Sequence, residues 1–173
     1  FVELWTSAHR FDPAKGSEVT LVCDQVVGST PFVETDGVKE VRIESKLLSA
    51  FYSRPTFMSA AVGLPKGYDS AADRRYPIYY EVPGFGGGSR SWSGRSRIPS
   101  TDRAGEKFLV VLLDPNCPTG HSVFADSANN GPCARALIEE LLPALRAKFN
   151  FSSAPGATLL RGQARTIEQH NAK

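Results

Sequence analysis

The chain has 173 residues, of which 41% are hydrophobic and 22% are charged, and its formal net charge is +2. These values are ordinary for a globular protein and exclude wholesale disorder, and the balanced charge does not favour nucleic-acid binding, which uses a clustered basic face. The longest uninterrupted apolar stretch, Phe108–Leu113, is far shorter than the ~20 residues that a membrane-spanning helix needs. No signal peptide is visible, but the chain begins with Phe1 rather than Met. We therefore expect the true start to be missing, which leaves the localisation unknown.

Three strands are predicted in the first part of the chain. Alternation of apolar and polar residues predicts strands at Glu18–Cys23 and Glu40–Glu44, with a turn-rich stretch between them. A third strand, Phe57–Leu64, stops at the turn cluster Pro65–Asp69. Residues 1–40 are expected to form an N-terminal β segment, either the end of a preceding domain or antiparallel strands that decorate the main sheet.

A fourth strand, Tyr76–Val82, is rich in aromatic and β-branched residues and ends in the glycine-rich segment Pro83–Gly88. The stretch from residue 86 to 105 combines Ser and Gly with four arginines, namely Arg90, Arg95, Arg97 and Arg103. This composition favours a solvated flexible loop, and a lid or a contact to an anionic substrate is the alternative.

The strand Phe108–Leu113 is apolar on both faces, which is typical of a central strand in a parallel sheet covered by helices. We expect Tyr76–Val82 and Ala157–Leu160 to flank it. A loop follows up to Gly131, and apolar residues at helical spacing then predict a helix to about Phe149: Ala134, Leu137, Ile138, Leu141, Leu142, Leu145 and Phe149. The helix is expected to kink near Pro143, because proline removes a backbone hydrogen bond. The fold class predicted is α/β, with a mostly parallel sheet and flanking helices.

The three cysteines, Cys23, Cys117 and Cys133, form no CxxC pair, and the three histidines are scattered. We therefore predict no metal site and no cofactor. Cys117 and Cys133 could form a disulfide in an exported protein, although small buried or loop thiols are the favoured interpretation.

Four short segments, in order along the chain, resemble those of a known family. Leu64–Asp69 (LPKGYD), followed by Tyr76–Tyr80, resembles the "LPxGYD…YPV" passage of an esterase family of α/β-hydrolases that includes enterochelin-esterase-like and esterase-D-like proteins. Pro83–Gly87 resembles the family's His-Gly-x-x-Gly oxyanion loop, with Pro83 where His is common. The segment Glu139–Leu145 resembles the helix that precedes the strand leading to the nucleophile. The resemblance covers roughly residues 40–162.

The resemblance implies acyl-ester hydrolysis by a serine esterase. A Ser in a G-x-S-x-G elbow attacks the carbonyl, a His accepts its proton, and an Asp or Glu orients that His. By position, the backbone N–H of Phe85, with Gly86 beside it, resembles the oxyanion-hole donor. A tight turn that binds no ligand is the alternative for Gly84–Gly88.

The resemblance then breaks at the expected nucleophile. Where the family has G-x-S-x-G, this chain reads Gly162-Gln-Ala164-Arg-Thr166, and it ends seven residues later. Ala164 occupies the nucleophile position, and no later sequence supplies the family's acid and His. We therefore expect residues 41–173 to be the N-terminal half of a hydrolase domain. We expect this truncated half to be inactive alone, so the sequence leaves open whether the chain is an enzyme.

Other serines do not replace the nucleophile. Ser122 follows Gly-His but lacks the closing glycine of an elbow. We expect this loop, with Asp126, Asn129 and Asn130, to lie at the mouth of a pocket that also includes Gly84. A small-molecule ester is the implied partner in the full-length family. The alternative function is a non-catalytic α/β binding module that uses the Gly/Arg-rich loop.

Overall fold

The computed structural model describes residues 3–6, 12, 14, 18, 20–27 and 30–162. The chain divides into two units, residues 1–31 and 32–173, earlier than the boundary expected after residue 40. In the first unit, β1 (Glu3–Trp5) pairs antiparallel with β2 (Gln25–Val27). The strand expected at Glu18–Cys23 is wrong, because the described residues of that span are irregular. Leu21 and Cys23, described residues of the predicted apolar face, are both exposed.

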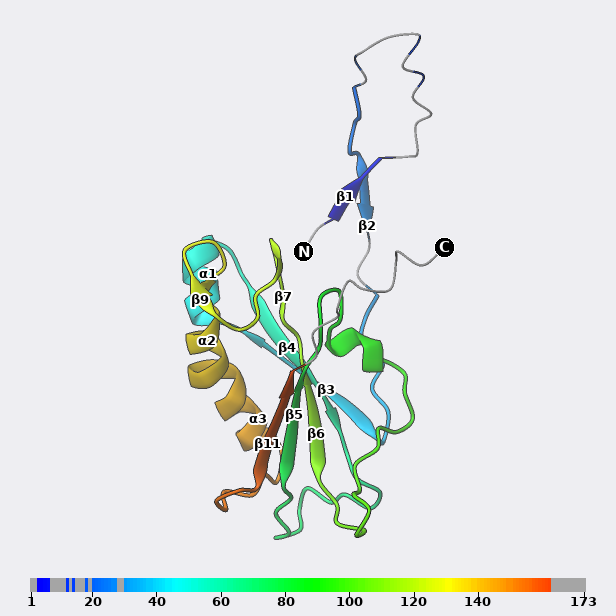
Figure 1. Ribbon diagram of the computed structural model, residues 1–173, viewed down its shortest axis with the longest axis vertical. Coiled ribbons are helices and arrows are strands. Elements are labelled where there is room, and N and C mark those ends of the chain that lie inside the picture. Colours follow the sequence, from blue (N-terminus) through cyan, green and yellow to red (C-terminus); the bar gives the residue numbers. More distant parts are fainter. Residues whose placement is uncertain are drawn as a thin grey trace, which may run out of the picture. The chain divides into compact units, whose positions relative to one another are not determined.

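The second unit contains a five-stranded sheet in the order β11–β5–β6–β4–β3 (Figure 1). Its strands are β3 (Val38–Glu44), β4 (Phe57–Gly63), β5 (Ile78–Val82), β6 (Leu109–Leu113) and β11 (Thr158–Gly162). Strands β11, β5 and β6 run parallel, whereas β4 is antiparallel to both β6 and β3. The sheet is therefore mixed rather than mostly parallel.

Strand β6 is interior, and all five of its residues are buried, as its two-sided apolar pattern predicts. One of its two neighbours, β5, is the expected one, and the other is not. β6 lies between β5 and β4, and β11 pairs with β5 instead of with β6. The apolar pattern reports burial on both faces, but it contains no information on which strands are adjacent or on their direction.

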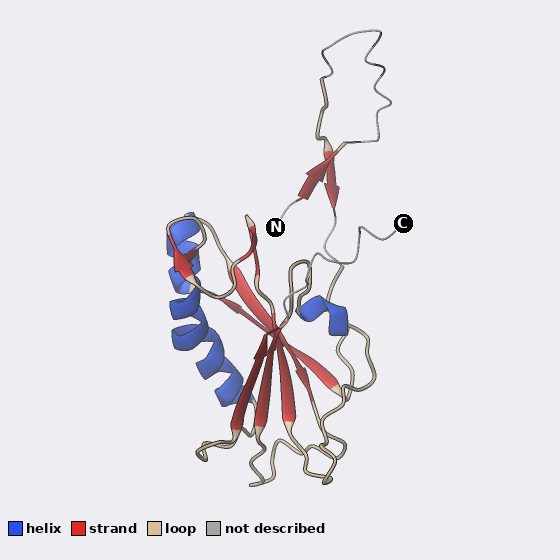
Figure 2. Cartoon of the chain, viewed as in Figure 1, coloured by secondary structure: helices blue, strands red, loops and turns tan. Residues whose placement is uncertain are grey.

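Helices cover one face of the sheet (Figure 2). They are α1 (Lys46–Tyr52) and a long helix made of α2 (Cys133–Ala136), a π-helical turn (Leu137–Leu141) and α3 (Leu142–Lys148). Leu141 and Leu145 are fully buried against the sheet and Leu137 is half-buried, which confirms the predicted packing. Ile138, expected on the same face, is 63% exposed.

The π-helical turn accounts for both Ile138 and the irregularity expected near Pro143. Proline has no N–H to donate to the carbonyl four residues before it, so an α-helical hydrogen bond to Glu139 is missing. A π-helical turn uses i→i+5 hydrogen bonds and takes more residues per turn than an α-helix. It therefore changes the phase of the apolar stripe, and Ile138 faces solvent.

The opposite face is covered by the chain that follows β5. The short 3₁₀ helix η1 (Ser89–Trp92) and the segment after it bury Trp92 and Ile98 against Val110 and Leu112. The expected solvated loop over residues 86–105 is therefore wrong, although its arginines are exposed. Two apolar residues, Trp92 and Ile98, anchor a segment whose composition is otherwise that of a flexible loop.

The stretch from Asp114 to Gly131, expected as a loop, contains two small hairpins. β7 (Asn116–Cys117) pairs with β8 (Gly120–His121), and β9 (Asp126–Ser127) pairs with β10 (Gly131–Pro132).

Among the described residues, no helix is long and apolar enough to cross a membrane.

Candidate active site

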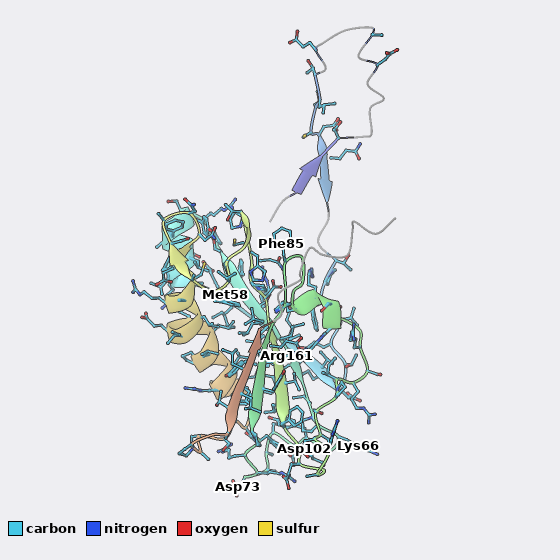
Figure 3. All side chains as sticks on the ribbon, in the orientation of Figure 1. Met58, Lys66, Asp73, Phe85, Asp102 and Arg161 are labelled. Atoms are coloured by element: carbon cyan, nitrogen blue, oxygen red, sulfur yellow. The ribbon has the colours of Figure 1, made fainter. Side chains whose placement is uncertain are left out.

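The loops relevant to function lie where the parallel strands end. Val82, the last residue of β5, is paired in register with Gly162, the last residue of β11. The loop that begins at Pro83 therefore starts beside the end of β11. Open α/β sheets bind ligands at this edge. Figure 3 shows Phe85 at this end of the sheet, with Asp73 and Asp102 at the opposite end. Ala164, expected at the nucleophile position, lies outside the described residues.

Residues 83–88, here called the glycine loop, form a tight turn closed by a hydrogen bond from the Gly87 N–H to the Gly84 carbonyl (2.9 Å). Gly86 has φ +76°, a left-handed conformation that strongly favours glycine. The Phe85 side chain is 73% exposed. No described residue accepts a hydrogen bond from the backbone N–H of Phe85 or Gly86. The oxyanion role of Phe85 and Gly86 stays a prediction.

A hydrogen-bonded polar cluster around the half-buried Asp114 lies next to the glycine loop. One carboxylate oxygen of Asp114 accepts from the hydroxyls of Ser89 (2.8 Å) and Ser59 (3.4 Å). The other accepts from the backbone N–H (3.1 Å) and the side-chain amide (2.6 Å) of Asn116. A Cβ at Gly88 would lie 2.5 Å from the Asn116 amide nitrogen, so this position needs glycine for close packing.

Sequence reasoning missed this cluster. The available signal was an aspartate placed directly after a buried strand, where chemistry-bearing residues gather in α/β sheets. Ser89 is fully buried and its hydroxyl donates to a carboxylate, so it does not have the exposure of a nucleophile. The cluster holds backbone in place rather than performing chemistry.

Ser122 is 5% exposed and its hydroxyl accepts a hydrogen bond from the backbone N–H of Phe124 (3.2 Å). Val123 and Phe124 both have positive φ, 48° and 50°, in the tight turn after Ser122. No histidine among the described residues bonds the Ser122 hydroxyl. Within the described part of the chain, Ser122 therefore has no histidine base to activate it.

The thiol of Cys133 donates to the carbonyl of Asn130 (3.0 Å). Burial raises the pKa of the Cys133 thiol, and the nearby thiol of Cys117 raises it further. Cys133 is therefore a poor candidate for a reactive thiolate. Both cysteines are free thiols in this structure.

Two of the residues expected near a pocket mouth contact helices instead. Asp126 accepts from the backbone N–H groups of Ala134 (2.7 Å) and Arg135 (3.2 Å) at the start of the long helix. The Asn130 carbonyl accepts from the hydroxyl of Tyr52 (3.1 Å). Asn129 is exposed. A pocket role for these residues stays a prediction.

Over the described part of the chain, no group of three His, Cys, Asp or Glu side chains could hold a metal ion.

No family model and no curated protein matches the chain. Solved structures do match. A ferulic acid esterase aligns with a TM-score of 0.55 and 20% identity over 73% of this chain and 50% of its own. A fluorophosphonate-binding serine hydrolase of Staphylococcus aureus, with substrate bound, aligns with a TM-score of 0.52 and 14% identity over 75% and 48%. A ferulic acid esterase from Anaeromyces mucronatus, in complex with ferulic acid, aligns with a TM-score of 0.49 and 21% identity over 78% and 51%.

The first two of these alignments identify the fold. These neighbours have α/β-hydrolase folds, and the second unit of this chain has the corresponding mixed sheet with few helices. The chain spans about half the length of the structures that it matches.

Proposed function

We propose that this chain supplies the oxyanion-binding part of a serine-type carboxylic-ester hydrolase related to the enterochelin-esterase-like and esterase-D-like proteins. The observation that carries the proposal is the position of the glycine loop. It follows β5, it begins beside the end of β11, and its Phe85 and Gly86 N–H groups have no acceptor among the described residues. In α/β-hydrolases one oxyanion donor comes from the loop after an earlier strand, and the nucleophile elbow follows the neighbouring strand.

The proposed chemistry is electrostatic. When an ester carbonyl is attacked, its oxygen gains negative charge, and N–H donors that already point at that oxygen stabilise the charge without reorganising. Removing one such donor typically costs about 10²–10³ in rate. Phe85 and Gly86 would provide the donors from the glycine loop. A further donor normally comes from the residue after the nucleophile.

We further propose that the 173 residues bind an ester product but do not turn an ester over by the serine mechanism. Ala164 has no hydroxyl at the position where the resemblance places the nucleophile, so no acyl-enzyme forms there. Residues 41–173 would correspond to the N-terminal half of a hydrolase domain, which agrees with the share of the neighbours that the chain spans.

The binding part of the proposal is tested by titrating the ¹⁵N-labelled chain with ferulate, the carboxylate that an ester of ferulic acid releases. The carboxylate resembles the oxyanion in charge, so we expect the largest amide shifts at Phe85 and Gly86. Shifts confined to Arg90, Arg95, Arg97 and Arg103 would instead support a binding module that uses the Gly/Arg-rich loop. No shift at either place would overturn both functions.

The catalytic part is tested by assaying a short-chain activated ester with the wild-type chain and a Ser122→Ala variant. We expect the same background hydrolysis in both, because no histidine among the described residues bonds the Ser122 hydroxyl. Turnover that the Ser122→Ala variant abolishes would make Ser122 a nucleophile and contradict the proposal.

A further inference from the structure

We propose that the β7–β8 hairpin is a clamp that positions the glycine loop, and that Asn116 and His121 are its two positioning residues. The inference rests on the proposed function, because the clamp would hold the backbone N–H donors of Phe85 and Gly86 in place for a ligand. It extends that function to residues that neither the sequence motifs nor the fold comparison indicate.

The two residues hold the two ends of the glycine loop. The side-chain amide of Asn116 donates to the carbonyl of Gly87 (3.2 Å). The Nε2 of His121 donates to the carbonyl of Pro83 (2.8 Å). Asn116 and His121 face each other as register partners in the hairpin. One short hairpin therefore bonds to both ends of the turn that carries the two N–H donors.

The orientation of Asn116 is itself fixed. Its side-chain amide and its backbone N–H both donate to the same oxygen of Asp114. The other Asp114 oxygen is occupied by the hydroxyl of the buried Ser89. Because a carboxylate only accepts hydrogen bonds, the NH₂ group of Asn116 must face it, and the second proton of that group is directed at Gly87.

The ring of His121 is held through both nitrogens. Its Nδ1 accepts from the backbone N–H of Val123 (3.0 Å), so Nε2 carries the proton that Pro83 accepts. Val123 is a β-branched residue with φ 48°, a conformation that is a genuine outlier for this residue type. Strain of this kind persists only where the surroundings impose it. Here it presents the Val123 N–H to the imidazole.

A third contact joins the hairpin to the tip of the glycine loop. A Cβ built at Gly120 would lie 3.0 Å from the ring of Phe85, so a larger residue in β8 would push on that ring. A loop with four glycines has many accessible conformations when nothing holds it. Oxyanion donors act only when they are preorganised, so the clamp would remove this freedom before a ligand arrives.

The clamp is tested by ¹⁵N relaxation of the 173-residue chain without ligand. In the wild type we expect the Phe85 and Gly86 amides to have order parameters near those of the sheet, about 0.85. The Asn116→Asp variant is isosteric and replaces the donor with an acceptor. In this variant and in His121→Leu, the order parameters of Phe85 and Gly86 should fall below about 0.6, while those of the sheet amides stay unchanged. His121→Gln keeps a donor at the Nε2 position and should restore the order.

The control is Asn129→Asp, the same chemical change at an exposed residue outside the glycine loop and the β7–β8 hairpin, which should leave Phe85 and Gly86 unchanged. Equal loop order in the wild type, Asn116→Asp and His121→Leu would overturn the clamp. If one of the two variants loses the dispersed spectrum of a folded chain, the loop order in the other variant decides whether the clamp stands. Loss of the folded spectrum in both would mean that the hairpin maintains the fold rather than the loop, and this outcome also overturns the inference.

The ferulate titration separates this inference from the proposed function. The clamp predicts that ferulate binds Asn116→Asp about threefold to tenfold more weakly than the wild type, the range that one lost hydrogen bond covers. If the wild type does not bind ferulate at Phe85 while loop order still depends on Asn116 and His121, the proposed function fails and the clamp stands. If ferulate binds wild type and Asn116→Asp equally well, the clamp fails and the proposed function stands.

Discussion

The hydroxyl of Ser45 donates a hydrogen bond to the carboxylate of Glu140, although the two residues are 95 positions apart in the chain. Ser45 is the N-cap of α1, and its oxygen also accepts from the backbone N–H of Leu48 (3.1 Å). The second carboxylate oxygen of Glu140 accepts from the backbone N–H of Leu47 (3.1 Å). The π-helical turn and the start of α1 are therefore joined through one buried serine.

Replacing this serine tests how much the connection contributes. Ser45→Ala removes the cap and the donor to Glu140, and we expect the free energy of unfolding to fall by about 1–3 kcal/mol. Urea denaturation measures the change. Ser91→Ala, at an exposed serine, is the control and should stay within about 0.5 kcal/mol of the wild type. A Ser45→Ala variant as stable as the control would show that the connection contributes little.

Leu141 and Ile138 provide a matched pair on the long helix. Leu141 is fully buried and Ile138 is 63% exposed. Leu141→Ala should cost about 2–5 kcal/mol, because it loses apolar burial and leaves a cavity. Ile138→Ala should cost about 0.5 kcal/mol or less. Equal losses of unfolding free energy in the two variants would mean that the π-helical turn does not place Leu141 in the core and Ile138 in solvent.

Asn150 fixes the loop before β5. Its side-chain amide donates to the carbonyls of Asp69 (3.3 Å), Ser70 (3.1 Å) and Ala72 (2.9 Å), and its carbonyl oxygen accepts from Arg75 (3.0 Å). Asn150→Ala leaves these groups without their partner, and we expect a loss of about 1–3 kcal/mol in the free energy of unfolding.

The variant Asn150→Asp sharpens this test. It keeps the shape of the side chain but directs an oxygen at three carbonyl oxygens, so it should destabilise at least as much as Asn150→Ala. Asn129→Asp supplies the exposed control. An Asn150→Asp variant with unchanged stability would contradict the hydrogen-bond network.

The buried Cys133 predicts a loss of stability at alkaline pH. Burial first, and then the Cys117 thiol, raise the pKa of Cys133 above its ordinary value of 9.0. Above pH 9 the unfolded chain releases this proton while the folded chain retains it, so the free energy of unfolding decreases as pH rises. Cys133→Ala removes this term, and its stability should decrease less between pH 8 and about pH 10. Chemical denaturation at each pH measures it, and parallel curves for the two proteins would contradict the assignment.

The sequence predicts those elements whose pattern depends on burial alone. β4, β5 and β6 appear where apolar and β-branched residues predict them, and the long helix occupies most of its predicted span. The helix α1 was not predicted. Its local start signal, the N-cap Ser45, is present in the sequence. However, the helix has only seven residues, which is too short to be stable without tertiary contacts, and its contact with Glu140 exists only in the folded chain.

Features that depend on pairing between distant segments were beyond the sequence pattern. Nothing in Phe108–Leu113 indicates that its second neighbour is β4 rather than β11, because a strand buried on both faces looks the same in either arrangement. The same limit applies to the candidate site. The glycines of the loop were visible as a motif. The turn residues Pro118 and Gly120 are also a turn signal, but they do not indicate that Asn116 and His121 bond to the glycine loop.

The pairing of β11 with β5 has a consequence for how the chain is made. Ile78 pairs with Thr158, eighty residues later, whereas Glu44 and Phe57 of the β3–β4 pair are thirteen residues apart. At a synthesis rate of about 5–20 residues per second, β5 waits roughly 4–16 s for β11 to be synthesised. During that interval its backbone groups on that side are an open edge, available to any extended segment nearby. On the ribosome, the strand that carries the glycine loop is therefore exposed to mispairing for longer than the β3–β4 pair.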